Sequence, residues 1–271
     1  MTGLGRRVLT AAVLLPPVLF LISLGPWGLA PLLAAFAVLG AREFVRLLGG
    51  PGPAHPPWIA AGSGVLLIAS CGGLLPLGVP AALVLIMLAA IVGGFLRRRG
   101  SMLSGLAVAL VGSIYLGLLP GYLLRFYAFG REGTVDPWPV YYALVLVWGC
   151  DTAAYLVGSQ IGRHRLWPRV SPSKSWEGAA AGVVGATMLA IGLGGWVPGL
   201  TLAGRLGAGL LVGVSAQVGD LAESMMKREA DLKDSGRMLP GHGGLLDRLD
   251  SLILAAPILY YWLRWSLTIP S

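Results

Sequence analysis

The stretch GAAAGVVGATMLAIGLGG, residues 178–195, decides the fold class, because it carries no charged side chain over a length that can cross a bilayer core as a helix. Its glycines are typical of helices that pack closely in lipid, where small residues let two backbones approach. Similar apolar runs lie on both sides of it, and the chain of 271 residues is 56% hydrophobic. The sequence therefore predicts an all-α, polytopic integral membrane helix bundle.

The lengths of the apolar runs, and the glycine, proline and charged residues that separate them, predict nine transmembrane spans. They run over residues 8–24, 27–47, 58–75, 79–96, 102–124, 138–158, 177–198, 203–226 and 249–265. The first span begins with basic residues, as a secretory signal does. We expect it to remain as an uncleaved helix, because further spans follow it and a small-x-small cleavage site does not.

The basic residues indicate the orientation, because short cytoplasmic loops carry an excess of Lys and Arg. With the N-terminus in the cytoplasm, 16 of the 20 Lys and Arg residues fall on the cytoplasmic side of the nine predicted spans. The net charge of +8 then reflects topology signals, and no nucleic-acid partner is expected. Cys71 and Cys150 lie in apolar stretches without ligand-like spacing, so we expect neither a disulfide framework nor a zinc site.

The acidic residues are unevenly distributed, since nine of the twelve lie between residues 151 and 250. We therefore expect residues 1–137 to form transmembrane scaffold helices and residues 138–271 to form the catalytic transmembrane domain. The cytoplasmic loops of that domain are predicted at 159–176 and 227–248.

Asp151 is embedded in the apolar stretch LVLVWGCDTAAYLVG, residues 144–158, and Asp220 with Glu223 in LLVGVSAQVGDLAESMMKRE, residues 210–229. An ionised carboxylate costs about 3 kcal/mol at the centre of a membrane helix unless it is paired or hydrated. Such acids are therefore functional candidates. The alternative is a structural pair with a neighbouring arginine or hydroxyl.

Helical spacing groups these acids with other polar residues. A stripe at i, i+3, i+4 and i+7 runs along one predicted helix face, formed by Asp220, Glu223, Ser224 and Lys227. Two more carboxylates stand at i and i+3 where the last span begins. Magnesium prefers hard oxygen ligands, few of them from protein and the rest from water and phosphate. We therefore expect Mg²⁺ to be held by Asp220, Glu223, Asp247 and Asp250. Alternatively, the last two only complement the positive end of a helix.

Two predicted cytoplasmic loops carry groups that bind phosphate. GRHRLWPRVSPSKSWEG, residues 162–178, joins four cations to three serines before a helix that begins near Trp176, and such a helix end binds anions. LPGHGGLLDRLD, residues 239–250, has paired glycines that leave the backbone open to a ligand. Taken alone, the first loop could be a topology signal with an ordinary serine N-cap, and His242 an incidental loop residue.

The stretch SMMKREADLKDSGRMLPGHGGLLDRLD, residues 224–250, resembles the signature of the phosphatidate cytidylyltransferases, also called CDP-diacylglycerol synthases. That signature reads, in outline, S-x-x-K-R, four residues, K-D, a spacer, then P-x-H-G-G-x-x-D-R-x-D, and every fixed position is filled here. The upstream segments DTAAY, GRHRL, SPSKSWEG and QVGDLAES match as well. The resemblance covers residues 148–255 closely, while the first half agrees only in being several apolar helices.

The resemblance implies an enzyme that transfers a cytidylyl group from CTP to phosphatidic acid, giving CDP-diacylglycerol and pyrophosphate in phospholipid biosynthesis. It implies dependence on magnesium, in some members with a second cation such as K⁺. It also implies a homodimer in the inner or plasma membrane, with the active site facing the cytoplasm.

Residue roles follow from the same resemblance together with the charge pattern. The phosphate of phosphatidic acid is already a nucleophile, so the enzyme's main task is positioning and charge neutralisation. The expected catalytic residues are Asp220, Lys227, Lys233, Asp247 and Arg248. The expected substrate-binding residues are Asp151, Ser171, Ser173, Lys174, Ser175, Ser224, Arg228, His242, Gly243 and Gly244.

Three other classes of protein stay open at this point. One is another membrane phosphotransferase, although the D-G-x-x-A-R motif of the CDP-alcohol phosphatidyltransferases is not found. A second is a proton- or cation-coupled transporter with Asp151, Asp220 and Glu223 as a relay. A third is a scaffold or insertion factor, which needs no buried acids.

Overall fold

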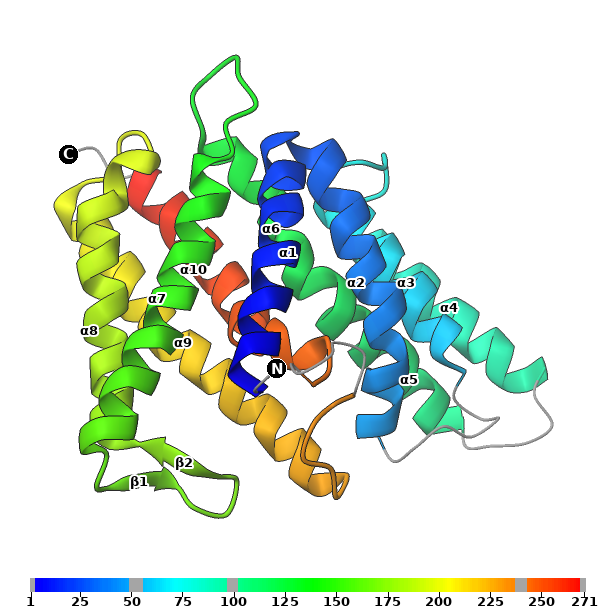
Figure 1. Ribbon diagram of the computed structural model, residues 1–271. Helices are drawn as coiled ribbons and strands as arrows, with labels where there is room; N and C mark the ends of the chain where they lie inside the picture. Colours follow the sequence, from blue (N-terminus) through cyan, green and yellow to red (C-terminus); the bar gives the residue numbers. More distant parts are fainter. Residues whose placement is uncertain (1–2, 49–55, 97–101, 237–242, 269–271) are drawn as a thin grey trace. The chain divides into compact units, whose positions relative to one another are not determined.

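The computed structural model describes residues 3–48, 56–96, 102–236 and 243–268 (Figure 1). Within these ranges the fold is all-α apart from one two-stranded hairpin. The helices are α1 (Gly3–Ser23), α2 (Pro26–Leu47), α3 (Pro57–Cys71), α4 (Val79–Leu96), α5 (Met102–Ser113), α6 (Leu119–Arg125), α7 (Trp138–Ile161), α8 (Trp176–Leu193), α9 (Leu202–Glu229) and α10 (Asp250–Thr268). Short helical turns are η1 (Ile114–Leu118), η2 (Phe126–Phe129), η3 (Gly194–Trp196) and η4 (Leu246–Arg248).

Each of the nine predicted spans coincides with a helix, the fifth with the continuous run α5–η1–α6. Among the described residues, five helical segments are long and apolar enough to cross a membrane: Pro26–Leu47, Met102–Phe129, Trp138–Ile161, Trp176–Trp196 and Leu202–Glu229. The chain is an integral membrane protein. Two points remain predictions: that all nine predicted spans cross the bilayer, and that the N-terminus is cytoplasmic.

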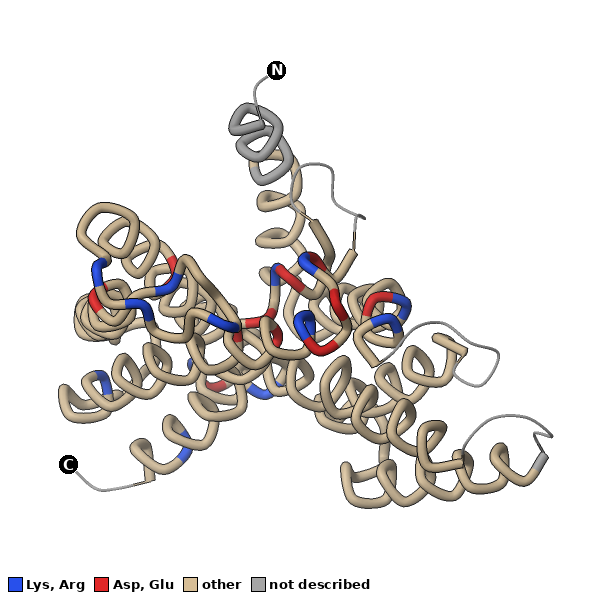
Figure 2. Tube along the Cα trace, turned by 90° about the horizontal axis from the view of Figure 1, so that it is seen from below, with Lys and Arg blue, Asp and Glu red and all other residues tan. Residues whose placement is uncertain are grey.

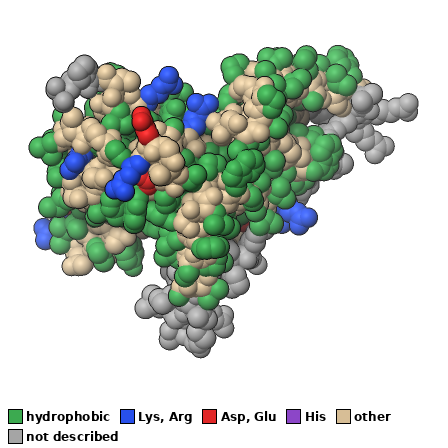
Figure 3. Space-filling model, turned by 90° about the horizontal axis from the view of Figure 1, so that it is seen from above, with side chains coloured by type: hydrophobic (Ala, Val, Ile, Leu, Met, Phe, Trp, Pro, Cys, Tyr) green, Lys and Arg blue, Asp and Glu red, His purple; other side chains and the backbone are tan. Residues whose placement is uncertain are grey.

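The surface suits a lipid environment. Figure 2 shows long stretches of helix without a charged residue, and the face in Figure 3 is dominated by hydrophobic side chains. Large apolar side chains lie almost fully exposed, among them Trp27, Phe95 and Leu103 at 77–78%. Such exposure is unfavourable in water and favourable against acyl chains.

The chain divides into two compact units. One comprises Met1–Leu124 with Met226–Arg248, and the other Arg125–Met225 with Leu249–Ser271. Helix α9 runs without a break through both, with its last four residues in the first unit. Residues 226–248 thus pack with the first half of the chain. The expected boundary at residue 137 separates scaffold helices from a catalytic domain, and this division by function remains a prediction.

In the first unit, α3 packs against α2, α4 and α5 (Figure 1). Proline begins α2 at Pro26, where its missing amide donor costs nothing. A core of Leu67, Ala82, Ile86 and Ala109 holds α3, α4 and α5 together. The helical run α5–α6 contains a π-helical turn at η1, where a side chain on Gly117 would collide with the backbone of Gly64.

In the second unit, α8 packs against both α7 and α9. A Cβ on Gly178 would lie 2.8 Å from the Ala154 carbonyl oxygen of α7, and one on Gly213 would lie 2.7 Å from the Val183 Cα of α8. The Tyr142 hydroxyl also donates to the Ala190 carbonyl, 3.2 Å away on α8. The expectation that residues 178–195 present glycines for close helix packing is therefore confirmed at Gly178, Gly182 and Gly185, whereas a Cβ on Gly192 or Gly195 would meet nothing within 4 Å.

The hairpin, β1 (Arg165–Trp167) and β2 (Ser171–Ser175), links α7 to α8 and was expected only as a loop. Its strands are antiparallel, with Arg165 opposite Ser175. β1 is only three residues long, and β2 is polar and contains a proline, so neither segment shows the alternation of apolar and polar residues that predicts a strand. The predicted start of the next helix near Trp176 is confirmed.

Candidate active site

The first candidate site lies in the second unit and is built on the hairpin and α9. Lys174 near the end of β2 places its Nζ 2.7 Å from Asp220 Oδ2 on α9, and both side chains are partly exposed. Ser224, one turn further along α9, has its hydroxyl 3.5 Å from Asp220 Oδ1. We call Lys174, Asp220, Ser224 and Asp250 the Asp220 cluster. Lys174 of the serine-rich loop and Asp220 of the polar stripe, which were predicted separately, thus form one ion pair.

Local structure explains why Lys174 is held there. Ser175 is the N-cap of α8, and its buried hydroxyl accepts a hydrogen bond from the Gly178 amide at 3.2 Å. In the first turn of α8, Glu177 accepts from the amides of Arg163 and His164 and contacts the His164 ring at 2.6 Å. Both ends of the hairpin are therefore tied to the start of α8. The N-cap alternative considered for this loop is realised at Ser175.

Asp250 joins the cluster through a close approach of α9 and α10. A Cβ on Gly219 would lie 2.5 Å from the Asp250 carbonyl oxygen, so the two backbones nearly touch beside Asp220. On the next residue, the Ser251 amide donates to Asp250 Oδ1 at 2.7 Å and the Ser251 hydroxyl donates to Asp151 Oδ1 at 3.1 Å. Asp151 is exposed at its position on α7. Acids from α7, α9 and α10 are thus neighbours within this unit.

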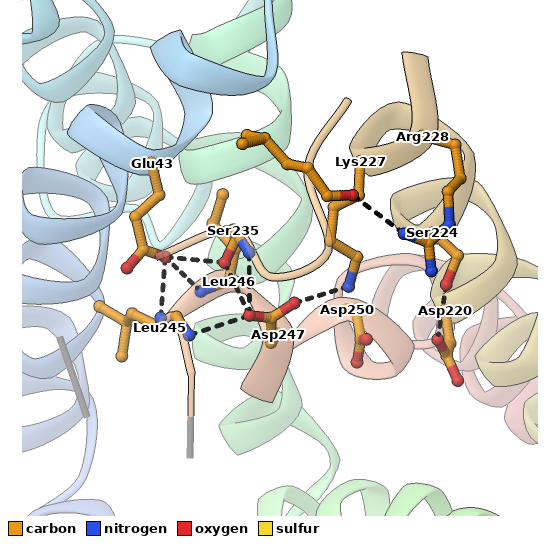
Figure 4. A network of polar contacts seen from close by, with 12 residues as sticks. Glu43, Asp220, Ser224, Lys227, Arg228, Ser235, Leu245, Leu246, Asp247 and Asp250 are labelled. Atoms are coloured by element: carbon orange, nitrogen blue, oxygen red, sulfur yellow. Dashed lines mark hydrogen bonds and ion pairs between the residues drawn. The ribbon is translucent and has the colours of Figure 1, made fainter. Parts of the chain in front are cut away.

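The second candidate site lies in the first unit and surrounds Asp247 of η4 (Figure 4). Lys227 Nζ lies 2.6 Å from Asp247 Oδ1, with the two side chains only 11% and 8% exposed. Asp247 Oδ2 accepts from the Ser235 amide at 3.1 Å, the Ser235 hydroxyl at 3.0 Å and the Gly244 amide at 2.9 Å. Burial opposes ionisation of this carboxyl, but Lys227 and these donors outweigh it and hold the pKa of Asp247 below its usual value.

The paired glycines have definite structural roles here. Gly243 has a φ of +82°, which glycine adopts without strain. A side chain on Gly244 would collide with the Ser235 hydroxyl, and its amide points at Asp247 rather than at open space. Whether the pair also approaches a ligand remains a prediction.

Glu43 on α2 completes this site, although it was expected only to belong to the scaffold helices. Its side chain is buried, with the residue 2% exposed. Glu43 Oε2 accepts from the Leu245 amide at 2.8 Å, the Leu246 amide at 3.0 Å and the Ser235 hydroxyl at 3.1 Å. We call Glu43, Lys227, Ser235, Gly244 and Asp247 the Asp247 cluster. The cost of an acid in an apolar span, applied earlier to Asp151, would also have selected Glu43.

The remaining predicted residues are placed as follows. Glu223 is fully buried on α9, and the Arg228 guanidinium donates to the Leu232 carbonyl at 3.1 Å. The Ser173 carbonyl accepts from Arg165 at 3.2 Å. Ser171 is half-buried, whereas the exposed members of the set are Ser173, Arg228, Lys233 and Arg248. His242 lies outside the described residues.

The donor set can be tested against magnesium. Within the part of the chain that the structure describes, no three His, Cys, Asp or Glu side chains gather as a metal site. Magnesium, however, is commonly held by one or two carboxylates with water and substrate phosphate. Asp220 and Asp247 offer such carboxylates, and each already contacts one cationic group, the ammonium of Lys174 or Lys227. The chemistry of the residues therefore fits a divalent cation, and its binding remains a prediction.

Comparison with known proteins defines the class. Residues 5–266 match the model of the cytidylyltransferase family, so the chain belongs to this family. The match includes the first half of the chain, where the sequence analysis found only general agreement.

Several relatives carry the name phosphatidate cytidylyltransferase. The protein of that name from Pseudomonas aeruginosa is 37% identical over 94% of this chain and 95% of its own length. The one from Brucella suis is 36% identical over 96% of this chain and 93% of its own length. The one from Synechocystis is 31% identical over 95% of both chains.

Proposed function

We propose that this chain is a phosphatidate cytidylyltransferase, which transfers the cytidylyl group of CTP to phosphatidic acid and so forms CDP-diacylglycerol for phospholipid biosynthesis. The observation that carries the proposal is the family match over residues 5–266, with relatives of that name aligned over at least 93% of their own lengths. Family membership also favours this activity over the transporter and scaffold alternatives.

In the proposed reaction a phosphate oxygen of phosphatidic acid attacks the α-phosphorus of CTP. The bond from that phosphorus to the bridging oxygen of the β-phosphate breaks, and pyrophosphate leaves. The attacking phosphate is already ionised, so no strong base is required. Two anions must approach each other, and catalysis then rests on positioning and on neutralising charge.

The lysines of the two clusters suit that task. Lys174 and Lys227 each lie within 2.7 Å of a carboxylate, so their ammonium groups are held in place before any substrate binds. We expect both ammonium groups to contact substrate phosphates, with Lys233, Arg228 and Arg248 adding positive charge from more exposed positions.

The carboxylates would hold the metal. The proposed magnesium ligands are Asp220, Glu223, Asp247 and Asp250. When bound, magnesium supplies positive charge that stabilises the attacking and leaving oxygens. A second cation such as K⁺ is proposed on the family resemblance alone.

The proposed setting is the inner membrane, with nine spans, a cytoplasmic N-terminus and a homodimeric assembly. Apolar helices would keep the diacyl tails in lipid, while the charged residues of the hairpin and of 227–248 would meet CTP from the cytoplasm. The bias of basic residues toward one side of the predicted spans supports this orientation.

A direct assay tests the function. Purified protein in detergent micelles is given phosphatidic acid and CTP labelled at its α-phosphate, with magnesium varied from zero. We expect label in the lipid phase, release of one pyrophosphate per labelled lipid, and no reaction without magnesium. Diacylglycerol, which lacks the attacking phosphate, is the control acceptor. Labelling of diacylglycerol, or CTP consumption without pyrophosphate, would contradict the proposal.

A further inference from the structure

Glu43 has a role that burial alone does not explain. It lies on α2, about 200 residues before the turn that it contacts, and its carboxylate is removed from solvent. A buried carboxylate is unfavourable unless it is well hydrogen-bonded. Among the residues that the structure describes, those that donate to Glu43 Oε2 lie in segments that also contact or carry Asp247 (Figure 4).

The first of these segments is the turn η4 that carries Asp247. The amides of Leu245 and Leu246 stand at the start of this turn, where N–H groups have no partner within the helix. Glu43 Oε2 accepts both, at 2.8 and 3.0 Å, and so gives each of these amides a hydrogen-bond partner. Glu43 therefore caps the turn from another helix and fixes the backbone just before Asp247.

The second segment is Ser235. Its hydroxyl lies 3.1 Å from Glu43 Oε2 and 3.0 Å from Asp247 Oδ2, and its amide donates to the same Asp247 oxygen. A serine hydroxyl has one proton to donate and is positioned here by both carboxylates. Glu43 thus holds two elements that define where the Asp247 carboxylate points, namely its own turn and its serine donor.

Two glycines, Gly236 and Gly244, leave room for the Glu43 carboxylate. A side chain on Gly236 would collide with Glu43 Oε1, and a Cβ on Gly244 would lie 2.7 Å from Glu43 Oε2. Both glycines are buried next to Asp247's own donors. The backbone on either side of the Asp247 carboxylate is therefore packed around Glu43.

We infer that Glu43 is a positioning residue for Asp247 in cytidylyl transfer, acting through Ser235 and the amides of residues 245 and 246. The inference rests on the proposed function. It assigns a task in the reaction to α2, in the half of the chain that was expected to be scaffold.

Glu43→Gln tests this, because glutamine keeps the shape and an acceptor for the two amides but loses the charge. Loss of a group that orients a functional ligand typically costs about 10–100-fold in activity. We expect kcat to fall by about that factor while the KM for CTP changes much less, and hydrogen exchange of the peptide containing Leu245 and Leu246 to become faster. Ser70→Ala, which removes a buried hydroxyl from α3 in the same unit, is the matched control and should change neither.

Unchanged kcat in Glu43→Gln overturns the inference, including when exchange at residues 245 and 246 accelerates, since the role is then purely structural. If Glu43→Gln does not accumulate, Gly236→Ala decides, because the three atoms nearest to the added methyl all belong to the Glu43 side chain, so this variant displaces Glu43 while Ser235 and Asp247 are unchanged. A reduced kcat in that variant supports the inference and an unchanged kcat overturns it. An inactive wild type would count against the proposed function, while faster exchange in Glu43→Gln would still show that Glu43 holds the turn.

Discussion

At the scale of single residues, each candidate site contains a carboxylate that is paired with a lysine, Asp220 with Lys174 and Asp247 with Lys227. Asp247 is the clearest case, because four donor groups contact its two oxygens and its pKa is held low. The Asp247 carboxyl group is therefore ionised at neutral pH. The signature selected Asp247 and Lys227 by spacing, but only the structure shows that they contact each other.

Asp247→Asn should abolish cytidylyl transfer, because a neutral amide cannot replace the carboxylate. Removing one partner of a buried pair typically costs about 3–5 kcal/mol, so we also expect a lower thermal unfolding midpoint in detergent. Adding Lys227→Met should restore part of the midpoint and none of the activity, since it removes the unpaired ammonium. Thermal scans and the labelled-CTP assay on both variants check this. Activity in either one would argue against a role for Asp247 in the reaction.

At the scale of elements, the site depends on where the β2–α8 junction and the α9–α10 contact place their side chains. The hairpin was not predicted, because its strands have no periodic signal, and yet it positions Lys174 against Asp220. Helix positions, by contrast, followed directly from apolar length.

Lys174→Ala should chiefly raise the KM for CTP, by about tenfold or more, because it removes a phosphate contact that we expect in the ground state. The Ser175 cap should keep α8 folded. Initial-rate kinetics over a range of CTP concentrations give the answer. A normal KM with a reduced kcat would instead assign this ammonium to the transition state.

Gly219→Ala should weaken both stability and activity, because the added methyl would press on the Asp250 carbonyl and force α9 from α10. Overpacking of this kind costs about 1–3 kcal/mol. Gly192→Ala on α8 is the control, since its Cβ would meet nothing within 4 Å, and alanine is the better helix former. Unfolding midpoints of the two variants should therefore move in opposite directions. Equal midpoints would contradict the close contact.

At the scale of the whole molecule, the sequence predicted the helices and most of the polar residues but not how the chain divides. Spacing along a helix reveals neighbours such as Asp220 and Ser224, whereas the contact of Glu43 with Ser235 spans 192 residues and leaves no local pattern. The same limitation hid the packing of residues 226–248 with the first 124 residues.

A fragment of residues 138–271 offers a test at this scale. It contains the whole signature but lacks α2, which contacts η4, and the rest of residues 1–124, with which residues 226–248 form one compact unit. We expect the fragment to be inactive and degraded, and co-expression with residues 1–137 to restore measurable activity. The measurement is cytidylyl transfer in membrane fractions from cells that express residues 138–271 alone or together with residues 1–137. An active fragment on its own would show that the first half is dispensable.

The space around Glu43 links positions that are far apart in the chain. Its carboxylate occupies the volume that glycine leaves at Gly236, where the three atoms nearest to an added Cβ all belong to Glu43, so this glycine is free to change only after the acid has gone. In related sequences these two positions should therefore covary, and lineages with a smaller residue at the position of Glu43 are where alanine should appear at the position of Gly236.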